Sequence, residues 1–212
     1  MMNNTGETLL PDFLMPAHQL CFLNHDILVE LLRSGEESGI FFQKFQFKDE
    51  SDKELFQDVQ DVFSWLERSG RSEERVELLK RVVFPALLSD FLHFVYEALE
   101  SSRKEKLAVA YALIRKPLQE TLFLFEVIAA DTERFAASLI EDPLKLRVKN
   151  AGGIDGHAKR IAVVLDAIGE SDRFDPEYLA LLRYAKVEDG FDGICNHAMH
   201  LFTEPKRYAR KR

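Results

Sequence analysis

Five of the six histidines lie in triplets of polar residues that repeat at i, i+3, i+7, the spacing of one helix face. The triplets are His18, Cys21 and His25; Asp90, His93 and Glu97; and His197, His200 and Glu204. Their imidazole, thiolate and carboxylate groups are the kinds of side chain that bind metals or move protons. The spacing therefore marks three candidate sites, and no complete catalytic signature accompanies any of them.

The strongest metal candidate combines two of these segments. Asp90, His93 and Glu97 supply oxygen and nitrogen ligands, and His197 and His200 supply further imidazoles. This ligand mixture suits zinc, manganese or iron, and helical bundles build such sites from side chains that face inward. The Glu-x-x-His pairs typical of di-iron bundles are absent. We therefore expect no cofactor, with a divalent metal as the alternative.

The two cysteines are weaker candidates. Cys21 shares a helix face with two histidines, and Cys195 is a conceivable fourth zinc ligand, but zinc sites built from cysteines normally show tighter paired spacing. Cys195 also precedes His197 closely, yet adjacency in sequence does not place a base on a sulfur atom. We expect two free thiols in a reducing compartment.

A polar face also occurs within the most apolar segment, residues 104–131. Arg115, Gln119 and Glu126 share one face there, while Lys116 and Glu120 have the i, i+4 spacing of a helical ion pair. A helix that is apolar nearly all round lies at the centre of a fold, so some of these charges must be buried and paired. They form either a structural tie or a polar pocket. The candidate catalytic residues are Arg115, Glu120, Glu126, His197 and His200.

The glycine-dense stretch 149–159 contains three glycines close to lysine residues. A phosphate-binding loop would end in Gly-Lys-Ser/Thr and follow a strand, and neither feature is present. The favoured interpretation is a flexible connection between helices, with Asp155 as the N-cap of the next one.

The composition predicts a folded all-α protein. Hydrophobic residues make up 46% of the 212-residue chain and charged residues 30%, which is the balance of a globular domain rather than of a disordered chain. Seventeen phenylalanines suit helix-on-helix packing, and ten glycines with seven prolines are too few for many short strands.

About eight helices are expected in one helical bundle. The domain spans 16–204, after an irregular lead-in over 1–15 and before a basic tail over 205–212. Pro85 and Pro117 fall inside the two central helices, which we expect to be bent or broken there. The segment 39–51 fits a helix or an aromatic-rich connector. The helices are expected near 16–34, 52–68, 72–102, 104–131, 132–142, 157–169, 176–186 and 191–204.

Charge and hydropathy limit the partners. The net charge of −8 disfavours binding to phosphate backbones, although five of the last seven residues are basic, so we expect nucleic acid to bind only through that tail, if at all. The first residues lack the basic and apolar regions of a signal peptide, and no run of about 18 uncharged apolar residues occurs. We expect a cytoplasmic protein that does not enter a membrane.

The sequence ALIRKPLQETLFLFE, followed downstream by NHAMHLFTE, resembles bacterial all-helical proteins of the abortive-infection and HEPN kind. The resemblance covers residues 75–204. HEPN proteins that cut RNA use an arginine followed four to six residues later by a histidine. Here Asn196 and His200 are the nearest approach, with asparagine where the family places arginine. The resemblance implies a helical bundle able to dimerise, and the missing arginine argues against RNA cleavage.

Two classes of function follow. The favoured class is a non-enzymatic interaction or regulatory module of a bacterial-type cytoplasmic protein, with a protein partner or self-association. The alternative is an enzyme with a polar pocket, either a metal-dependent hydrolase or a HEPN-like RNA-cleaving protein; small-molecule binding within the bundle is a third. An enzyme predicts that Arg115 and the C-terminal histidines converge in a cleft. An interaction module predicts an exposed apolar patch on a phenylalanine-rich face.

Overall fold

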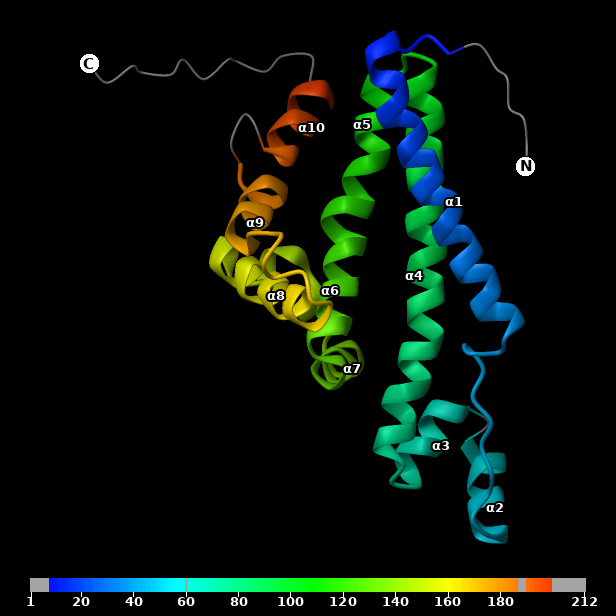
Figure 1. Cartoon of the computed structure of the whole chain (residues 1–212). Coiled ribbons are helices and arrows are strands. Elements are labelled where there is room, and N and C mark those ends of the chain that lie inside the picture. The colour runs from blue at the N-terminus through cyan, green and yellow to red at the C-terminus, as the bar shows by residue number, and fades with distance from the viewer. Residues whose placement is uncertain (1–7, 60, 187–189, 200–212) are drawn as a thin grey trace.

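The computed structural model describes residues 8–59, 61–186 and 190–199, and this part of the chain confirms the all-α prediction. The structure is 79% helical, and the described residues form no strand. Ten α-helical segments are labelled in Figure 1, and α5 and α6 join end to end through a π-helical turn, which makes nine helices instead of about eight.

Three long helical elements run side by side and alternate in direction (Figure 1). Pro16 lies in the first turn of α1, as expected, because a proline there removes no helical hydrogen bond. α4 packs against α1 on one side and against α5 on the other. The bounds of these helices are Met15–Glu37 for α1, Ser72–Arg103 for α4 and Leu107–Lys116 for α5.

The two internal prolines have different effects. α4 continues through Pro85 as one helix of 32 residues, so the helix is not broken at this proline. Pro117 begins the π-helical turn Pro117–Thr121, after which the chain continues as α6 (Leu122–Ala130). A π turn widens the helix by one residue, which accommodates the missing N–H of proline without ending the helix.

The single helix expected over 52–68 is two helices. α2 (Glu50–Val59) and α3 (Val62–Arg68) are separated at Asp61, whose carboxylate accepts hydrogen bonds from the backbone N–H groups of Phe63 and Ser64. This N-cap starts a new helix and overrides the apolar stripe that runs across the break. The preceding residues 42–47 form an extended connector, one of the two structures expected there.

The C-terminal half begins with α7, which Asp131 caps by accepting from the N–H of Arg134. The prediction of Asp155 as an N-cap is wrong, because the helix starts two residues earlier, after Gly152 in a left-handed conformation. α8 and α9 form a hairpin, and α10 packs against α5. The bounds are Thr132–Glu141 for α7, Gly153–Ala167 for α8, Pro176–Tyr184 for α9 and Phe191–Met199 for α10.

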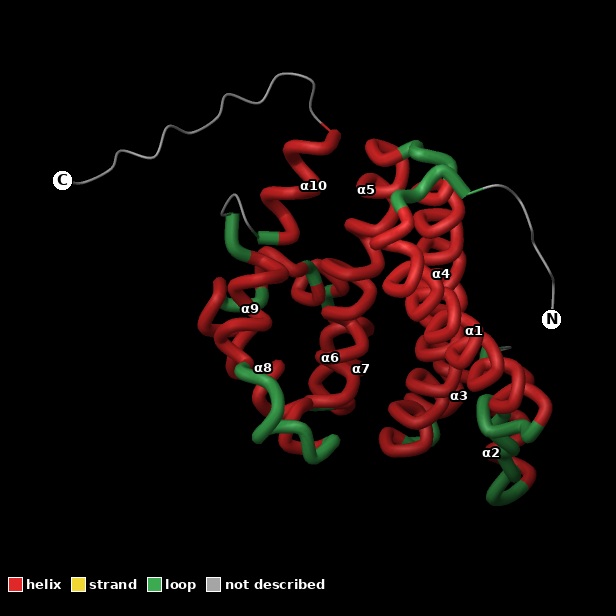
Figure 2. The backbone as a smooth tube through the Cα atoms, turned by 45° about the horizontal axis from the view of Figure 1, so that its top comes forward, coloured by secondary structure: helices red, strands yellow, loops and turns green. Residues whose placement is uncertain are grey.

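Most of the buried apolar residues in the described part of the chain fall into three small clusters rather than one core. One joins α4, α6 and α7 around Phe135; one lies within the α8–α9 hairpin around Ile161; and one surrounds Trp65 of α3. Figures 1 and 2 both place α8, α9 and α10 across the α5–α6 rod from α4 and α1. The bundle is therefore open and elongated.

α4 is the one helix of the described part whose length and hydropathy would suit a membrane span, and α1, α3, α5 and α7 pack against it. The predicted lead-in is described only from residue 8 and includes a short 3-10 turn at Asp12–Leu14. The predicted basic tail at 205–212 lies outside the described residues.

Candidate functional site

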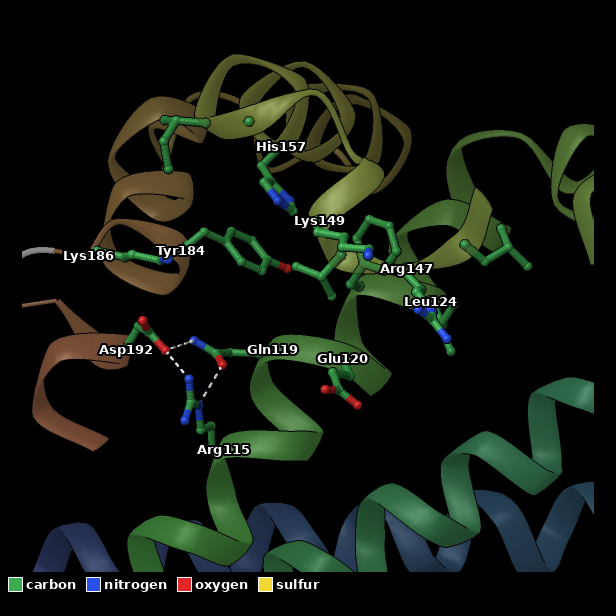
Figure 3. A pocket seen from close by; sticks show the side chains of 15 residues that line it. Arg115, Gln119, Glu120, Leu124, Arg147, Lys149, His157, Tyr184, Lys186 and Asp192 are labelled. Atoms are coloured by element: carbon green, nitrogen blue, oxygen red, sulfur yellow. Dashed lines mark hydrogen bonds and ion pairs between the residues drawn. The ribbon is translucent and has the colours of Figure 1, made fainter. Parts of the chain in front are cut away.

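A cavity of about 780 Å³ opens between the π turn, the start of α8, the end of α9 and the start of α10. Its walls carry apolar side chains, among them Phe123 and Leu146, together with a set of polar groups that converge on the space (Figure 3). Concave sites with a few convergent polar groups are the usual places for small ligands. The polar lining residues are Arg115, Gln119, Glu120, Arg147, Lys149, His157, Tyr184, Lys186 and Asp192.

Arg115 forms one polar corner of this cavity with Gln119 and Asp192 (Figure 3). The Asp192 carboxylate accepts from Arg115 at 2.7 Å and from the Gln119 amide at 3.1 Å, while the Gln119 oxygen accepts from Arg115 Nε at 3.1 Å. The Gln119 amide also donates to the backbone carbonyl of Arg183 at 3.2 Å. This network ties α5, the π turn, α9 and α10 together and fixes the Arg115 guanidinium at the cavity wall.

Glu126 is buried behind the cavity between two arginines, which confirms that charges in the apolar helix are buried and paired. One carboxylate oxygen accepts from Arg160 at 3.1 and 3.0 Å, and the other accepts from Arg183. The arginines come from α8 and α9, so the ion pairs fasten that hairpin to α6. Two guanidinium groups face one carboxylate, which leaves an excess positive charge next to the cavity.

The rings of His157 and Tyr184 stack on each other next to these arginines, with their centroids 3.6 Å apart. Burial, and then the charges of Arg160 and Arg183, lower the pKa of His157 to about 4. Arg160 donates to His157 Nδ1 at 2.6 Å, so this nitrogen is the acceptor and the ring is neutral with its proton on Nε2. Burial also raises the pKa of Tyr184 to about 12, so its phenol stays protonated.

Three more cations lie along the rim of the cavity. Arg147, Lys149 and Lys186 form no ion pair with any residue that the structure describes. Glu120, an exposed residue of the π turn, also lines the cavity. Lys116 pairs with Asp90 of α4 at 2.7 Å instead of with Glu120, because Asp90 lies within reach across the α4–α5 contact.

The structure does not assemble the predicted metal ligands among the residues it describes. Asp90 forms an ion pair with Lys116. His93 and Glu97 are exposed on α4. His197 is exposed on α10 and does not line the cavity. No group of three or more His, Cys, Asp or Glu side chains in this part of the chain lies close enough to hold a metal. His200 lies outside the described residues, so its part in a site remains a prediction.

The two histidines of the first triplet pack against α4. His18 Nε2 lies 3.1 Å from the Leu99 carbonyl oxygen and 3.0 Å from the Ser102 hydroxyl, and His25 packs on the ring of Tyr96. Cys21 is exposed, whereas Cys195 is buried, and burial raises the pKa of the Cys195 thiol. Such a thiol is a poor nucleophile, because the thiolate is the reactive form.

A second surface stands out on α1, which has no buried residue. Its exposed side carries Leu20, Leu23, Ile27 and Leu31, which are 57, 57, 56 and 58% exposed. Their spacing of i, i+3, i+7, i+11 places all four on one helix face, opposite the face that packs on α4. We call these four residues the α1 stripe. It is an exposed apolar patch of leucine and isoleucine, not of phenylalanine.

Sequence reasoning identified Arg115 and Glu126 but missed most of their surroundings. Arg160, Arg183 and Asp192 follow Glu126 or Arg115 by 34, 57 and 77 residues, and no local spacing links such distant positions. The available signal was the unsatisfied charge in an apolar helix, which required cations from elsewhere. His157 belongs to the glycine-dense stretch, the other signal in the sequence that leads to this cavity.

Comparisons of the chain with protein-family models, with curated proteins and with solved structures gave no match.

Proposed function

We propose that this protein is a non-enzymatic helical interaction module that associates with a second copy of itself through the α1 stripe. The observation that carries the proposal is the two-sided character of α1: one apolar face packs on α4, and the other faces solvent. A helix that is apolar on two faces is normally covered on both.

The shape of the stripe favours a second copy as its partner. The four residues span 20 to 31 along one helix, a length of about 16 Å at the helical rise. Two such helices can pack antiparallel about a two-fold axis, which brings Leu20 of each copy opposite Leu31 of the other. Glu30 and Arg33, which form an ion pair at 2.6 Å, lie at the edge of the stripe and give it a polar rim.

The size of the stripe predicts a weak dimer. Complete burial of a leucine or isoleucine side chain contributes about 1.5–3 kcal/mol, and these residues are already about half buried. Eight such side chains in a dimer would be offset in part by the loss of free rotation and translation on association. We therefore expect dissociation in the micromolar range.

The test is light scattering on a sizing column with the wild type and with the double variant Leu23→Asp/Ile27→Asp, loaded at about 1 to 200 μM, the range that brackets a micromolar dissociation constant. The wild type should change from monomer to dimer with concentration, and the variant should stay monomeric with unchanged circular dichroism. The matched control, Gln46→Asp/Gln57→Asp, adds the same charge at exposed positions outside α1 and should still dimerise. A wild type that is monomeric throughout, or a stripe variant that dimerises like the control, would contradict the proposal.

A further inference from the structure

The rim of the cavity beside α8 combines cations that form no ion pair with the described residues and the positive end of a helix. Arg147 and Lys149 flank a single residue of the 3-10 turn Val148–Asn150, and Gly153 and Ile154 of the first turn of α8 line the same cavity. We propose that this cavity binds a small molecule through a phosphate group, which is held by Arg147, Lys149 and the first backbone N–H groups of α8.

The charge of the lining supports an anionic ligand. Four cationic side chains line the cavity against the two carboxylates of Glu120 and Asp192, although the chain as a whole carries a net charge of −8. Asp192 is already paired with Arg115. Behind the wall, Arg160 and Arg183 share one carboxylate, so their excess charge also favours an anion in a cavity with few other counterions.

The backbone at the start of α8 is shaped for close approach. Gly152 and Gly153 both have positive φ, at 85° and 68°, and no side chain caps this end of the helix. A Cβ atom added to Gly156 would lie 1.8 Å from the carbonyl oxygen of Ala151, so glycine there allows the loop to fold tightly over the first turn. The first N–H groups of a helix are ready donors for a phosphate oxygen.

The other walls indicate the rest of the ligand. Phe123, Leu124 and Ile154 present apolar surface, which suits a carbon skeleton. The Tyr184 phenol points toward the cavity, and its raised pKa keeps it a donor (Figure 3). Glu120 also lines the cavity, where its carboxylate would repel phosphate and accept from a hydroxyl or amine. The ligand is therefore a small organic phosphate that also carries a hydrogen-bond donor.

The first experiment is a titration of ¹⁵N-glycine-labelled protein with inorganic phosphate and with pyrophosphate at constant ionic strength. The chain has ten glycines, so their amide signals can be resolved and assigned. Saturable shifts are expected at Gly152 and Gly153, and none at Gly39 or Gly70, which lie on other elements. Absence of saturable binding by both probes would overturn the proposal. Succinate is the carboxylate probe, and binding as tight as that of pyrophosphate would overturn the assignment to phosphate.

The variant Arg147→Gln/Lys149→Gln should weaken binding of pyrophosphate at least about tenfold by calorimetry, since each removed group is a charge-assisted donor. The control Lys44→Gln/Lys106→Gln removes the same net charge from exposed positions on other elements and should bind like the wild type. Equal affinities for the two variants would refute the assigned position. The α1 stripe takes no part in this cavity, so Leu23→Asp/Ile27→Asp should bind pyrophosphate normally whether or not the protein dimerises.

Discussion

The buried charges around Glu126 determine what the individual residues of the cavity can do. His157 is neutral because it is buried and faces two guanidinium groups, and it accepts a hydrogen bond from one of them. A histidine in this state cannot supply a proton near neutral pH. Tyr184, with a pKa of about 12, cannot serve as a base there either. The polar groups of the cavity are thus suited to binding and less suited to proton transfer.

The depressed pKa of His157 predicts a loss of stability in mild acid. Its pKa is about 6.5 in the unfolded chain and about 4 in the folded one, so the unfolded state binds the proton more readily between these values. Stability that is complete above pH 6.5 should fall as the pH approaches 4. From pH 7 to pH 5 the loss should be about 2 kcal/mol.

The measurement is urea unfolding at pH 7 and pH 5 for the wild type and for His157→Gln. Glutamine keeps an acceptor for Arg160 but does not titrate, so the variant should lose about 2 kcal/mol less than the wild type between the two pH values. Carboxylates that titrate near pH 5 affect both proteins equally and cancel in the comparison. The same loss in both proteins would show that His157 is not the group responsible.

At the scale of elements, the first turn of α8 depends on Gly156. In most helices, replacing an interior glycine by alanine stabilises the fold by about 1 kcal/mol. Here the added methyl group would meet the backbone oxygen of Ala151, which cannot move aside as a flexible side chain can. Gly156→Ala should therefore destabilise the protein, by about 2 kcal/mol or more, the usual cost of overpacking.

This expectation is checked by comparing the thermal unfolding of the Gly156→Ala variant with that of the Val163→Ala variant. Val163 is 50% exposed on the same helix, so its replacement should change stability by less than about 0.5 kcal/mol. A stabilised Gly156→Ala variant would mean that the loop over residues 150–152 does not pack on α8 as described.

Local signals in the sequence predicted the elements better than their connections. α4, α7 and α9 begin at Ser72, Thr132 and Pro176, as the sequence predicted, because acidic first turns, N-caps and first-turn prolines act over a few residues. Asp61 was missed because the apolar spacing of residues 55–66 continues across it. In the site, the burial of Glu126 followed from its apolar neighbours. Its arginine partners could not be predicted in this way, since they depend on how α8 and α9 dock against α6.

For the whole molecule, the division of the buried residues into small clusters has a thermodynamic consequence. The cluster around Trp65 packs α2 and α3 on one end of α4, and the α8–α9 cluster shares no residue with it. Small clusters joined by few buried residues unfold with less cooperativity than a single core.

Urea unfolding followed by two probes should therefore give two different midpoints. Trp65 is the only tryptophan, so fluorescence reports on its own cluster, whereas circular dichroism averages over all helices. Equal midpoints and slopes for the two probes would show that the molecule unfolds as one unit.

The contrast between the two cysteines makes the unmodified chain suitable for site-directed labelling. Cys21 is exposed on α1, on the turn that also carries Leu20 and Leu23, while Cys195 is fully buried. A maleimide should react with Cys21 alone in the folded protein, because the buried thiol is both inaccessible and protonated. In the proposed dimer, a single nitroxide at this natural position would then report the distance between the two α1 helices directly, without any engineered residue.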